Sequence, residues 1–204
     1  MHSFYSALMG GVLTGLGGAA SLGADQRIVG AFLFSFGMFA ALSLGLPQYP
    51  GRCGRAICGG QARTLYVILP GNLLGAALTG LLYGLAVTGN VADLQAAKLA
   101  QSFPSTLLRG VFCGMILFSA AEGWKRLESG KAFGVLLGVP AFILAGFENI
   151  LADTFYFSAA FTQSGVFDPR ALLFLLAAGI GNTIGAVLLC LALSKENADP
   201  SRAG

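Results

Sequence analysis

Three polar residues stand close together in a stretch that is otherwise apolar, and they are the side chains best placed to do chemistry. Glu148 and Asn149 follow Gly146-Phe147, and Asp153 comes four residues after Asn149. Residues four apart lie on the same face of a helix, so the Asn149 amide and the Asp153 carboxyl would point the same way. An amide donates and accepts hydrogen bonds but does not titrate. We therefore expect Asn149 to bind and orient a small polar molecule, and to cap a helix, without passing on a proton.

The two carboxyl groups would be costly if this stretch crosses a membrane. Even low estimates put the cost of a charged side chain at the bilayer centre at about 2.5–3.5 kcal/mol, and acids found there are functional candidates. For Glu148 we expect a structural role, in which its carboxylate accepts backbone N–H groups at a helix break. Asp153 leaves two possibilities. If it is ionised and faces a pore, it opposes anions and favours neutral or cationic solutes; if it is protonated or faces a neighbouring subunit, it does not.

Few other residues could carry catalysis or bind a cofactor. The single histidine, His2, is near the N-terminus, and the four cysteines show no C-x-x-C spacing. A zinc site needs several such ligands together, and nucleophilic catalysis needs a nucleophile beside a base. The twelve Lys and Arg residues are too few and too scattered for a nucleic-acid surface. We predict no metal, no cofactor, no nucleic-acid partner and no enzymatic activity.

Composition places these residues in an integral membrane protein. Of the 204 residues, 55% are hydrophobic and only 10% are charged, against about 25% charged residues in soluble domains. A helix needs roughly 20 apolar residues to cross a bilayer, and the stretches between charges provide six such spans. We predict an all-α membrane protein with a single transmembrane domain over residues 1–204. The spans are expected at residues 4–23, 28–46, 64–89, 104–122, 132–163 and 171–194.

Two of these spans contain helix breakers. The second meets Pro47 and Pro50, and a proline lacks the amide donor and clashes with the preceding turn, so we expect a break at 47–51. The fifth is interrupted at 146–149, where Gly146 begins the polar segment. Irregular backbone at membrane depth is tolerated only where protein or a water-filled cavity surrounds it. Broken helices in corresponding places are typical of transporters.

A short motif recurs in the two halves of the chain. Gly71-Asn72-Leu73-Leu74-Gly75 in the third span returns 110 residues later as Gly181-Asn182-Thr183-Ile184-Gly185 in the sixth. Three spans repeated after an odd number of crossings must be inverted relative to each other, which predicts a 3+3 inverted repeat with broken helices 2 and 5. The small residues at these positions also allow helices to approach closely.

The basic residues indicate the orientation. The loops after the second and fourth spans and the C-terminal tail carry eight Lys and Arg residues, and the other side carries four. Because basic residues stay preferentially on the cytoplasmic side, we expect a multi-pass protein of the cell membrane with both termini in the cytoplasm.

The chain resembles the formate/nitrite transporters, which are pentameric channels with an aquaporin-like protomer. The resemblance covers almost the whole chain. It rests on Gly146-Phe147-Glu148-Asn149 with Lys131-Ala132-Phe133 before it, on the two Gly-Asn-x-x-Gly segments and on the Phe-rich run at 32–37. It implies a homopentamer in the lipid bilayer, with a pore in each protomer that narrows at two apolar constrictions around a polar site.

The resemblance also implies roles for particular residues. By position, Phe34 and Phe142 would form the outer constriction, and Met38 with Tyr49 the inner one. Lys98 falls where the family places a lysine that attracts anions.

The chain departs from the family at its polar site. Most members have a histidine after Gly-Phe-Glu, and this chain has Asn149. Where an asparagine often follows, this chain has Asp153. The Leu-Phe-Thr loop of the family is replaced by Gln48-Tyr49-Pro50.

Together these features predict a channel or transporter for a small monovalent weak-acid anion such as formate, nitrite or hydrosulfide. The anion would cross the apolar constrictions as its neutral acid or together with a proton. Two alternatives remain open. The missing histidine and the added Asp153 also fit a channel for a small neutral solute such as urea, ammonia or water. The altered Gln48-Tyr49-Pro50 loop also fits a non-conducting membrane scaffold or sensor that keeps the fold.

Overall fold

The described part of the chain consists of helices joined by short connections. The structure, a computed structural model, describes residues 3–87 and 91–197, and no strand occurs within them. Apart from a short 3₁₀ turn at Ala62–Thr64, its elements are α1 (Phe4–Leu22), α2 (Arg27–Ser43), α3 (Tyr49–Cys58), α4 (Leu65–Ala86), α5 (Val91–Leu99), α6 (Phe103–Arg126), α7 (Lys131–Leu144), α8 (Ile150–Ser164) and α9 (Arg170–Asn197).

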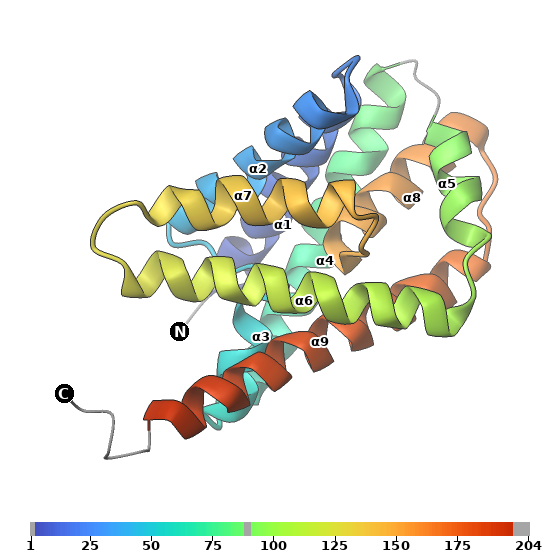
Figure 1. Cartoon of the computed structure of the whole chain (residues 1–204). Helices are drawn as coiled ribbons and strands as arrows, with labels where there is room; N and C mark the ends of the chain where they lie inside the picture. Colours follow the sequence, from blue (N-terminus) through green and yellow to red (C-terminus); the bar gives the residue numbers. More distant parts are fainter. Residues whose placement is uncertain (1–2, 88–90, 198–204) are drawn as a thin grey trace.

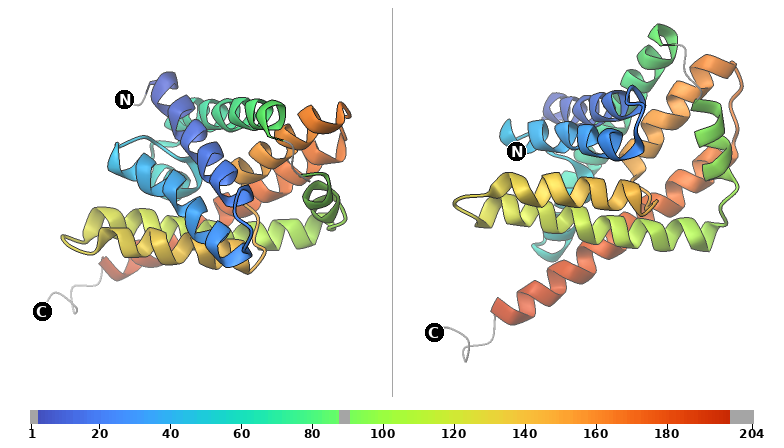
Figure 2. Two further views of the ribbon diagram at one scale, coloured as in Figure 1. Left: turned by 90° about the horizontal axis from the view of Figure 1, so that it is seen from above. Right: turned by 45° about the horizontal axis from the view of Figure 1, so that its top comes forward.

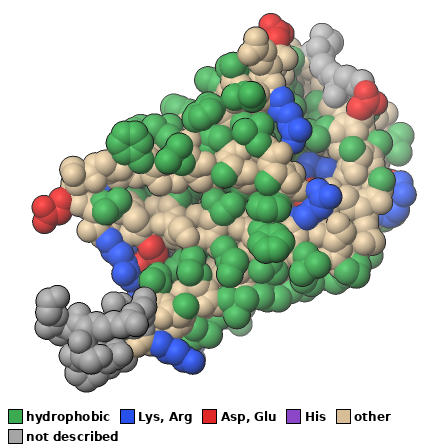
Figure 3. Space-filling model, viewed as in Figure 1, with side chains coloured by type: hydrophobic (Ala, Val, Ile, Leu, Met, Phe, Trp, Pro, Cys, Tyr) green, Lys and Arg blue, Asp and Glu red, His purple; other side chains and the backbone are tan. Residues whose placement is uncertain are grey.

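Apolar side chains cover the flanks of this bundle. Among the described residues, three helical segments are long and apolar enough to cross a bilayer, at Ala62–Ala86, Phe103–Arg126 and Arg170–Lys195, while α2 and α7 are apolar but shorter. Figure 3 shows hydrophobic side chains over the face that α6 and α7 form, with Lys, Arg, Asp and Glu gathered toward its two ends. Such a large exposed apolar surface fits lipid rather than water, and the chain is a membrane protein.

A left-handed glycine, rather than a proline, ends the first broken helix. Gly45 has φ 69°, a conformation that glycine adopts without steric cost. The N–H of Leu46 then reaches back to the carbonyl of Ala41 at 2.8 Å, as in a Schellman motif. The sequence analysis expected the helix to run to residue 46 and to break at 47–51, but α2 already ends at Ser43.

The two prolines frame the start of the next helix instead. Pro47 is fully buried, and Gln48 is extended at φ −118° and ψ 131°. Pro50 lies in the first turn of α3, where the missing N–H would have had no helical partner. Pro47 and Pro50 were expected to end the second span, but α2 ends before either of them. They lie instead around the start of α3, which begins at Tyr49.

The second broken helix has the same construction. Gly146 has φ 71°, and the N–H of Phe147 donates to the carbonyl of Phe142 at 2.9 Å. The chain then runs through an irregular segment until α8 begins at Ile150, with Asn149 as its N-cap. The irregular segments connect α2 with α3 and α7 with α8 (Figure 1). Each begins at the surface and ends buried, at Pro47 and Gln48 in the first and at Glu148 and Asn149 in the second.

A buried asparagine from another helix holds each break. The side chain of Asn72, on α4, donates to the carbonyls of Ala7 and Pro47 and accepts from the N–H of Tyr49 at 2.7 Å. This one amide satisfies backbone groups on both sides of the break and ties the break to α1.

Asn182 on α9 makes the equivalent set of contacts at the second break. It donates to the carbonyls of Gly110 and Glu148 at 3.0 and 2.8 Å and accepts from the N–H of Ile150 at 3.0 Å. The two asparagines of the recurring sequence motif therefore do the same work in the two halves of the chain.

The glycines of the same motif let two pairs of helices touch backbone to backbone. A β-carbon on Gly75 would collide with the backbone of Leu8, and one on Gly185 with the backbone of Val111. Consequently α4 packs closely on α1, and α9 packs closely on α6.

The remaining packing is also paired between the two halves. Helix α3 packs on α9 and α8 on α4, while α2 and α7 pack against each other. In Figures 1 and 2, α1 begins and α9 ends toward the same end of the bundle, on the left. The sequence analysis did not predict the short helix α5, which packs on α8.

Candidate functional site

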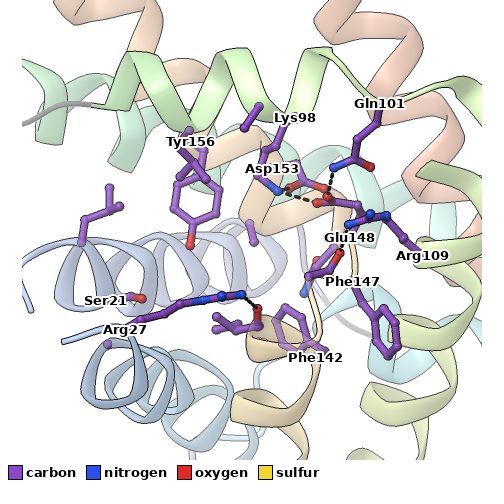
Figure 4. A pocket seen from close by; sticks show the side chains of 18 residues that line it. Ser21, Arg27, Lys98, Gln101, Arg109, Phe142, Phe147, Glu148, Asp153 and Tyr156 are labelled. Carbon is purple, nitrogen blue, oxygen red and sulfur yellow. Dashed lines mark hydrogen bonds and ion pairs between the residues drawn. The ribbon is translucent and has the colours of Figure 1, made fainter. Parts of the chain in front are cut away.

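A large cavity opens beside the α7–α8 break. Its volume is about 540 Å³, and it collects side chains from α1, α2, α5, α6 and α8 (Figure 4). The polar or charged side chains that line this outer cavity are Ser21, Arg27, Lys98, Gln101, Arg109, Glu148, Asn149, Asp153 and Tyr156.

Two phenylalanines close the inner end of the outer cavity. Phe142 lines the outer cavity and also the next one, which Phe34 lines as well. The two rings meet edge to face with centroids 6.0 Å apart, and each side chain is only 3% exposed. Phe34 and Phe142, which the resemblance assigns to an outer constriction, form a ring pair at the junction of two cavities.

The next cavity, which we call the central cavity, is very small. Its volume is about 20 Å³, room for roughly one water molecule. Asn149 lines both the outer and the central cavity. The central cavity therefore has room for only a very small solute or part of one. Such a solute meets the polar side chains of the cavity immediately inside the ring pair.

Two further cavities continue toward the other end of the bundle. Met38, Gln48 and Gly51 line the central cavity and also a second small one of about 20 Å³. Arg52 and Lys125 line that second small cavity and also an inner cavity of about 410 Å³. Successive cavities share lining residues along the whole series, from Lys98 on one side to Arg52 on the other.

Tyr49 does not line this series, although it was expected beside Met38. Its hydroxyl lies 2.7 Å from Oγ1 of Thr183 on α9, and its ring belongs to a core cluster with Phe118 and Cys53. The backbone turns at the start of α3, so that Tyr49 points into the core and its neighbour Gln48 points into the cavities.

Gln48 occupies the place that the sequence analysis gave to Tyr49. Its Nε2 donates to Oγ1 of Thr14 at 2.8 Å and to the carbonyl of Gly10 at 3.2 Å. A polar residue between two prolines in a predicted membrane span was the sequence signal for Gln48. The prediction chose the aromatic ring of the neighbouring Tyr49 instead.

An ion-pair cluster stands in the wall of the outer cavity (Figure 4). The ammonium of Lys98 donates to Oε2 of Glu148 and, at 2.7 Å, to Oδ1 of Asp153. Gln101 donates to the other oxygen of Glu148 at 2.7 Å. The side chains are 11% exposed at Lys98, 3% at Glu148 and 1% at Asp153. We call Lys98, Glu148 and Asp153 the charge cluster.

The electrostatics of Lys98 follow from this arrangement. Burial by itself disfavours the charged form, but the carboxyl groups of Asp153 and Glu148 outweigh burial and raise the pKa of the ammonium above its ordinary value. Lys98 therefore stays positively charged at neutral pH while most of its charge is compensated locally.

Glu148 was expected to accept backbone N–H groups at the helix break. Its carboxyl group instead accepts hydrogen bonds from Lys98 and Gln101. The free N–H groups at the start of α8 are satisfied by asparagines. Ile150 donates to Asn182, and Leu151 donates to Oδ1 of Asn149 at 2.9 Å.

The oxygen and the nitrogen of the Asn149 side-chain amide differ in their partners. Its Oδ1 caps α8, while its Nδ2 group makes no hydrogen bond within the part of the chain that the structure describes. The side chain is 6% exposed and borders two cavities. Two N–H donors are thus available to a molecule in the narrow part of the series.

Two arginines add positive charge to the outer cavity. Arg27 donates to the carbonyl of Leu144 at 3.0 Å, and Arg109 donates to the carbonyl of Gly146 at 2.8 Å. They satisfy carbonyl groups at the end of α7 that have no helical partner. The sequence analysis used both arginines only to count charges, although their places near the ends of spans hinted at this role.

Comparisons with known proteins agree with this arrangement. A family model described as "Formate/nitrite transporter" matches residues 1–194. A solved structure described as "FNT family ion channel" is 20% identical, with a TM-score of 0.82 over 97% of this chain and 90% of that chain. Another, "Pentameric formate channel with formate bound", is 17% identical, with a TM-score of 0.78 over 95% of each chain. No curated protein sequence matches the chain.

Proposed function

The chain belongs to the formate/nitrite transporter family, and we propose that it conducts a small monovalent weak-acid anion, such as formate, nitrite or hydrosulfide, across the cell membrane. Membership of this family makes the chain a transport protein rather than an enzyme. The observation that carries the choice of solute is the position of Asn149, whose side chain borders the narrowest part of the cavity series and whose Nδ2 makes no hydrogen bond within the described residues.

The size of the narrow part limits what can pass. The two small cavities have volumes of about 20 Å³ each, so a solute must be very small or must wait for side chains to move. An anion with one to three heavy atoms can accept hydrogen bonds from the Asn149 amide, and Gln48 offers a second amide just beyond it.

The electrostatics favour entry as an anion and passage as a neutral acid. Arg27 and Arg109 surround the outer cavity with positive charge, which raises the local concentration of anions. The ring pair of Phe34 and Phe142 offers no charge to replace lost hydration, and a charge at membrane depth costs about 2.5–3.5 kcal/mol or more. A weak acid that takes up a proton before the ring pair avoids this cost.

We propose that the fold is a 3+3 inverted repeat that crosses the membrane six times, with α2–α3 and α7–α8 as the two broken crossings. The matching contacts of Asn72 and Asn182 support this plan, as do the paired packings of α1 with α4 and of α6 with α9. The excess of basic residues at one end supports cytoplasmic termini.

We further propose that the protomers assemble as a homopentamer, each with its own pore. The fold shared with a pentameric formate channel supports this assembly. Large apolar side chains that remain exposed on α2, α4 and α9 are available for lipid and for neighbouring protomers.

Substitution of Asn149 tests the proposal. In proteoliposomes, Asn149→Ser keeps an N-cap oxygen for α8 but withdraws the amide donors from the cavities. Because a hydrogen bond to a charged group contributes about 1.5–3 kcal/mol, we expect formate uptake to fall about tenfold or more. Glu128→Gln, at an exposed residue in the α6–α7 connection, serves as the matched control and should conduct normally.

The result also decides between the solute classes. Formate uptake by Asn149→Ser at the wild-type rate, in correctly folded protein, would remove Asn149 from the pathway. Urea or ammonia uptake that ignores pH, without formate uptake, would favour the neutral-solute alternative. If the wild-type protein moves no small solute, the remaining alternative is that it is a non-conducting scaffold or sensor.

A further inference from the structure

The charge cluster contains one more carboxyl group than its cation can neutralise. Both carboxyl groups, of Glu148 and Asp153, lie within hydrogen-bond distance of the single nitrogen of Lys98, so the two are near neighbours. All three side chains are almost inaccessible to solvent. Two ionised carboxylates this close, with one ammonium between them, would leave a buried negative charge, which is strongly unfavourable. Carboxyl pairs in such positions share a single proton.

The hydrogen bonds indicate which carboxyl group holds the proton. Both oxygens of Glu148 accept from donors, one from Lys98 and one from Gln101, and a carboxylate is the form that accepts twice. Asp153 accepts from Lys98 through Oδ1 only, and its buried Oδ2 has no hydrogen-bond partner within the described residues. An oxygen that no donor serves is the natural place for the proton.

Several other ionisable groups surround the cluster. Arg27 of α2 and Arg109 of α6 are cations that line the same cavity. Cys113 of α6, Tyr156 of α8 and Tyr83 of α4, which packs on α8 through Phe155, are neutral in their ordinary forms at neutral pH. Within the described residues the two arginines donate to backbone carbonyls and form no ion pair with either carboxyl group. Tyrosine and cysteine are weaker bases for this role than a second carboxylate is, because they are already protonated at neutral pH, so the excess proton belongs to the Glu148–Asp153 pair.

We propose that the Glu148–Asp153 pair holds one proton at neutral pH, carried mainly on Asp153, and that it is the proton source for the permeant acid in this protein. The proposal rests on the proposed function, and it deepens that function by naming the donor. Asn149 borders the same cavity but cannot titrate.

The step is a simple proton transfer. Asp153 lines the outer cavity, but its Oδ2 is buried, so the carboxyl group must first turn toward the cavity. Its O–H bond then breaks, an O–H bond forms on the anion held there, and no electrons change hands. Lys98 stabilises the Asp153 carboxylate that remains. Loss of hydration as the anion nears the ring pair raises its affinity for the proton, so transfer is favoured where the solute must become neutral. Water in the outer cavity, which at about 540 Å³ has ample room, returns a proton to the pair.

Infrared spectroscopy of the purified protein tests the proton directly. We expect a C=O band of a buried, protonated carboxylic acid at neutral pH. Asp153→Asn and Glu148→Gln each leave Lys98 with a single carboxylate and should each abolish the band, while Glu128→Gln should keep it. Absence of the band in the wild type would overturn the proposal. That outcome is independent of transport, so it differs from a failure of the proposed function.

Transport by Asp153→Asn tests the donor role. This variant keeps the Lys98–Glu148 ion pair, so we expect normal folding and formate uptake reduced about tenfold or more at neutral pH, with a pH profile that follows protonation in bulk water. Uptake with the wild-type rate and pH profile would overturn the role of the pair as donor. If Asp153→Asn fails to fold, Glu148→Gln and the pH titration of the wild-type infrared band decide the question in the same way.

Discussion

The ammonium of Lys98 donates hydrogen bonds to two buried carboxyl groups at once. Lys98→Met keeps most of the side-chain volume but leaves Glu148 and Asp153 without a cation. Breaking a buried ion pair by removing one partner is strongly destabilising. We expect a loss of about 3–5 kcal/mol in the free energy of unfolding, measured as a lower midpoint of thermal unfolding in detergent.

The double variant Lys98→Met/Glu148→Gln is the control for this prediction. It removes the carboxyl group that carries the negative charge and leaves the protonated Asp153 in place. It should therefore recover part of the stability lost in the single variant. Additive losses from the two substitutions would contradict the idea that Lys98 and Glu148 act through each other.

Sequence reasoning reached part of the site at the level of single residues. Phe34, Phe142 and Met38 line the cavity series, and Asn149 and Asp153 face the same outer cavity, four residues apart. Spacing and residue type carried that information for Asn149 and Asp153, whereas the places of Phe34, Phe142 and Met38 came from the resemblance to the family.

Gln48 and the two arginines were missed for a physical reason. Which of two neighbouring residues at a break faces a cavity depends on the direction in which the next helix leaves, and contacts with distant helices set that direction. Tyr49 turns away because Thr183 on α9 offers its hydroxyl a partner. Arg27 and Arg109 find their partners at the end of α7, far away in the sequence.

At the level of elements, the two helix breaks depend on left-handed glycines. A β-carbon added to Gly45 would meet no atom within 4 Å, so a substitution there reports backbone strain alone. Gly45→Ala should destabilise the protein by about 1–2 kcal/mol, measured by thermal unfolding. Gly45→Asn is the matched control and should cost less, because asparagine tolerates this conformation better than alanine. Equal effects of the two substitutions would contradict a strained turn at Gly45.

The existence of the breaks could be predicted, but not how they begin. The cluster of Pro47 and Pro50 and the polar residues after Gly146 mark irregular backbone in a membrane span. The helix nevertheless ends earlier, at Ser43, since the left-handed turn at Gly45 closes α2 before the first proline is reached. Helix α5 escaped prediction because it is short, and its packing on α8 is a tertiary contact.

For the molecule as a whole, the orientation in the membrane can be tested with the native cysteines. Cys58, at the end of α3, is partly exposed, while Cys53, Cys113 and Cys190 are buried. If the basic end faces the cytoplasm, a membrane-impermeant thiol reagent should label Cys58 in inside-out vesicles and not in right-side-out cells.

Two variants complete the orientation experiment. Cys58→Ser should abolish the labelling, and Asp25→Cys in the α1–α2 turn should be labelled from the opposite side only. Labelling of native Cys58 in right-side-out cells would contradict the proposed orientation.

The measurement that tests the whole account most directly is the driving force for formate uptake by purified protein in liposomes. Passage through the Phe34–Phe142 ring pair as a neutral acid predicts that an imposed pH gradient, acidic outside, drives uptake and that one proton enters with each formate. It also predicts that a membrane potential imposed at equal pH leaves the rate unchanged. Uptake that follows the membrane potential, with no proton movement, would show that formate crosses as the bare anion and would contradict the account.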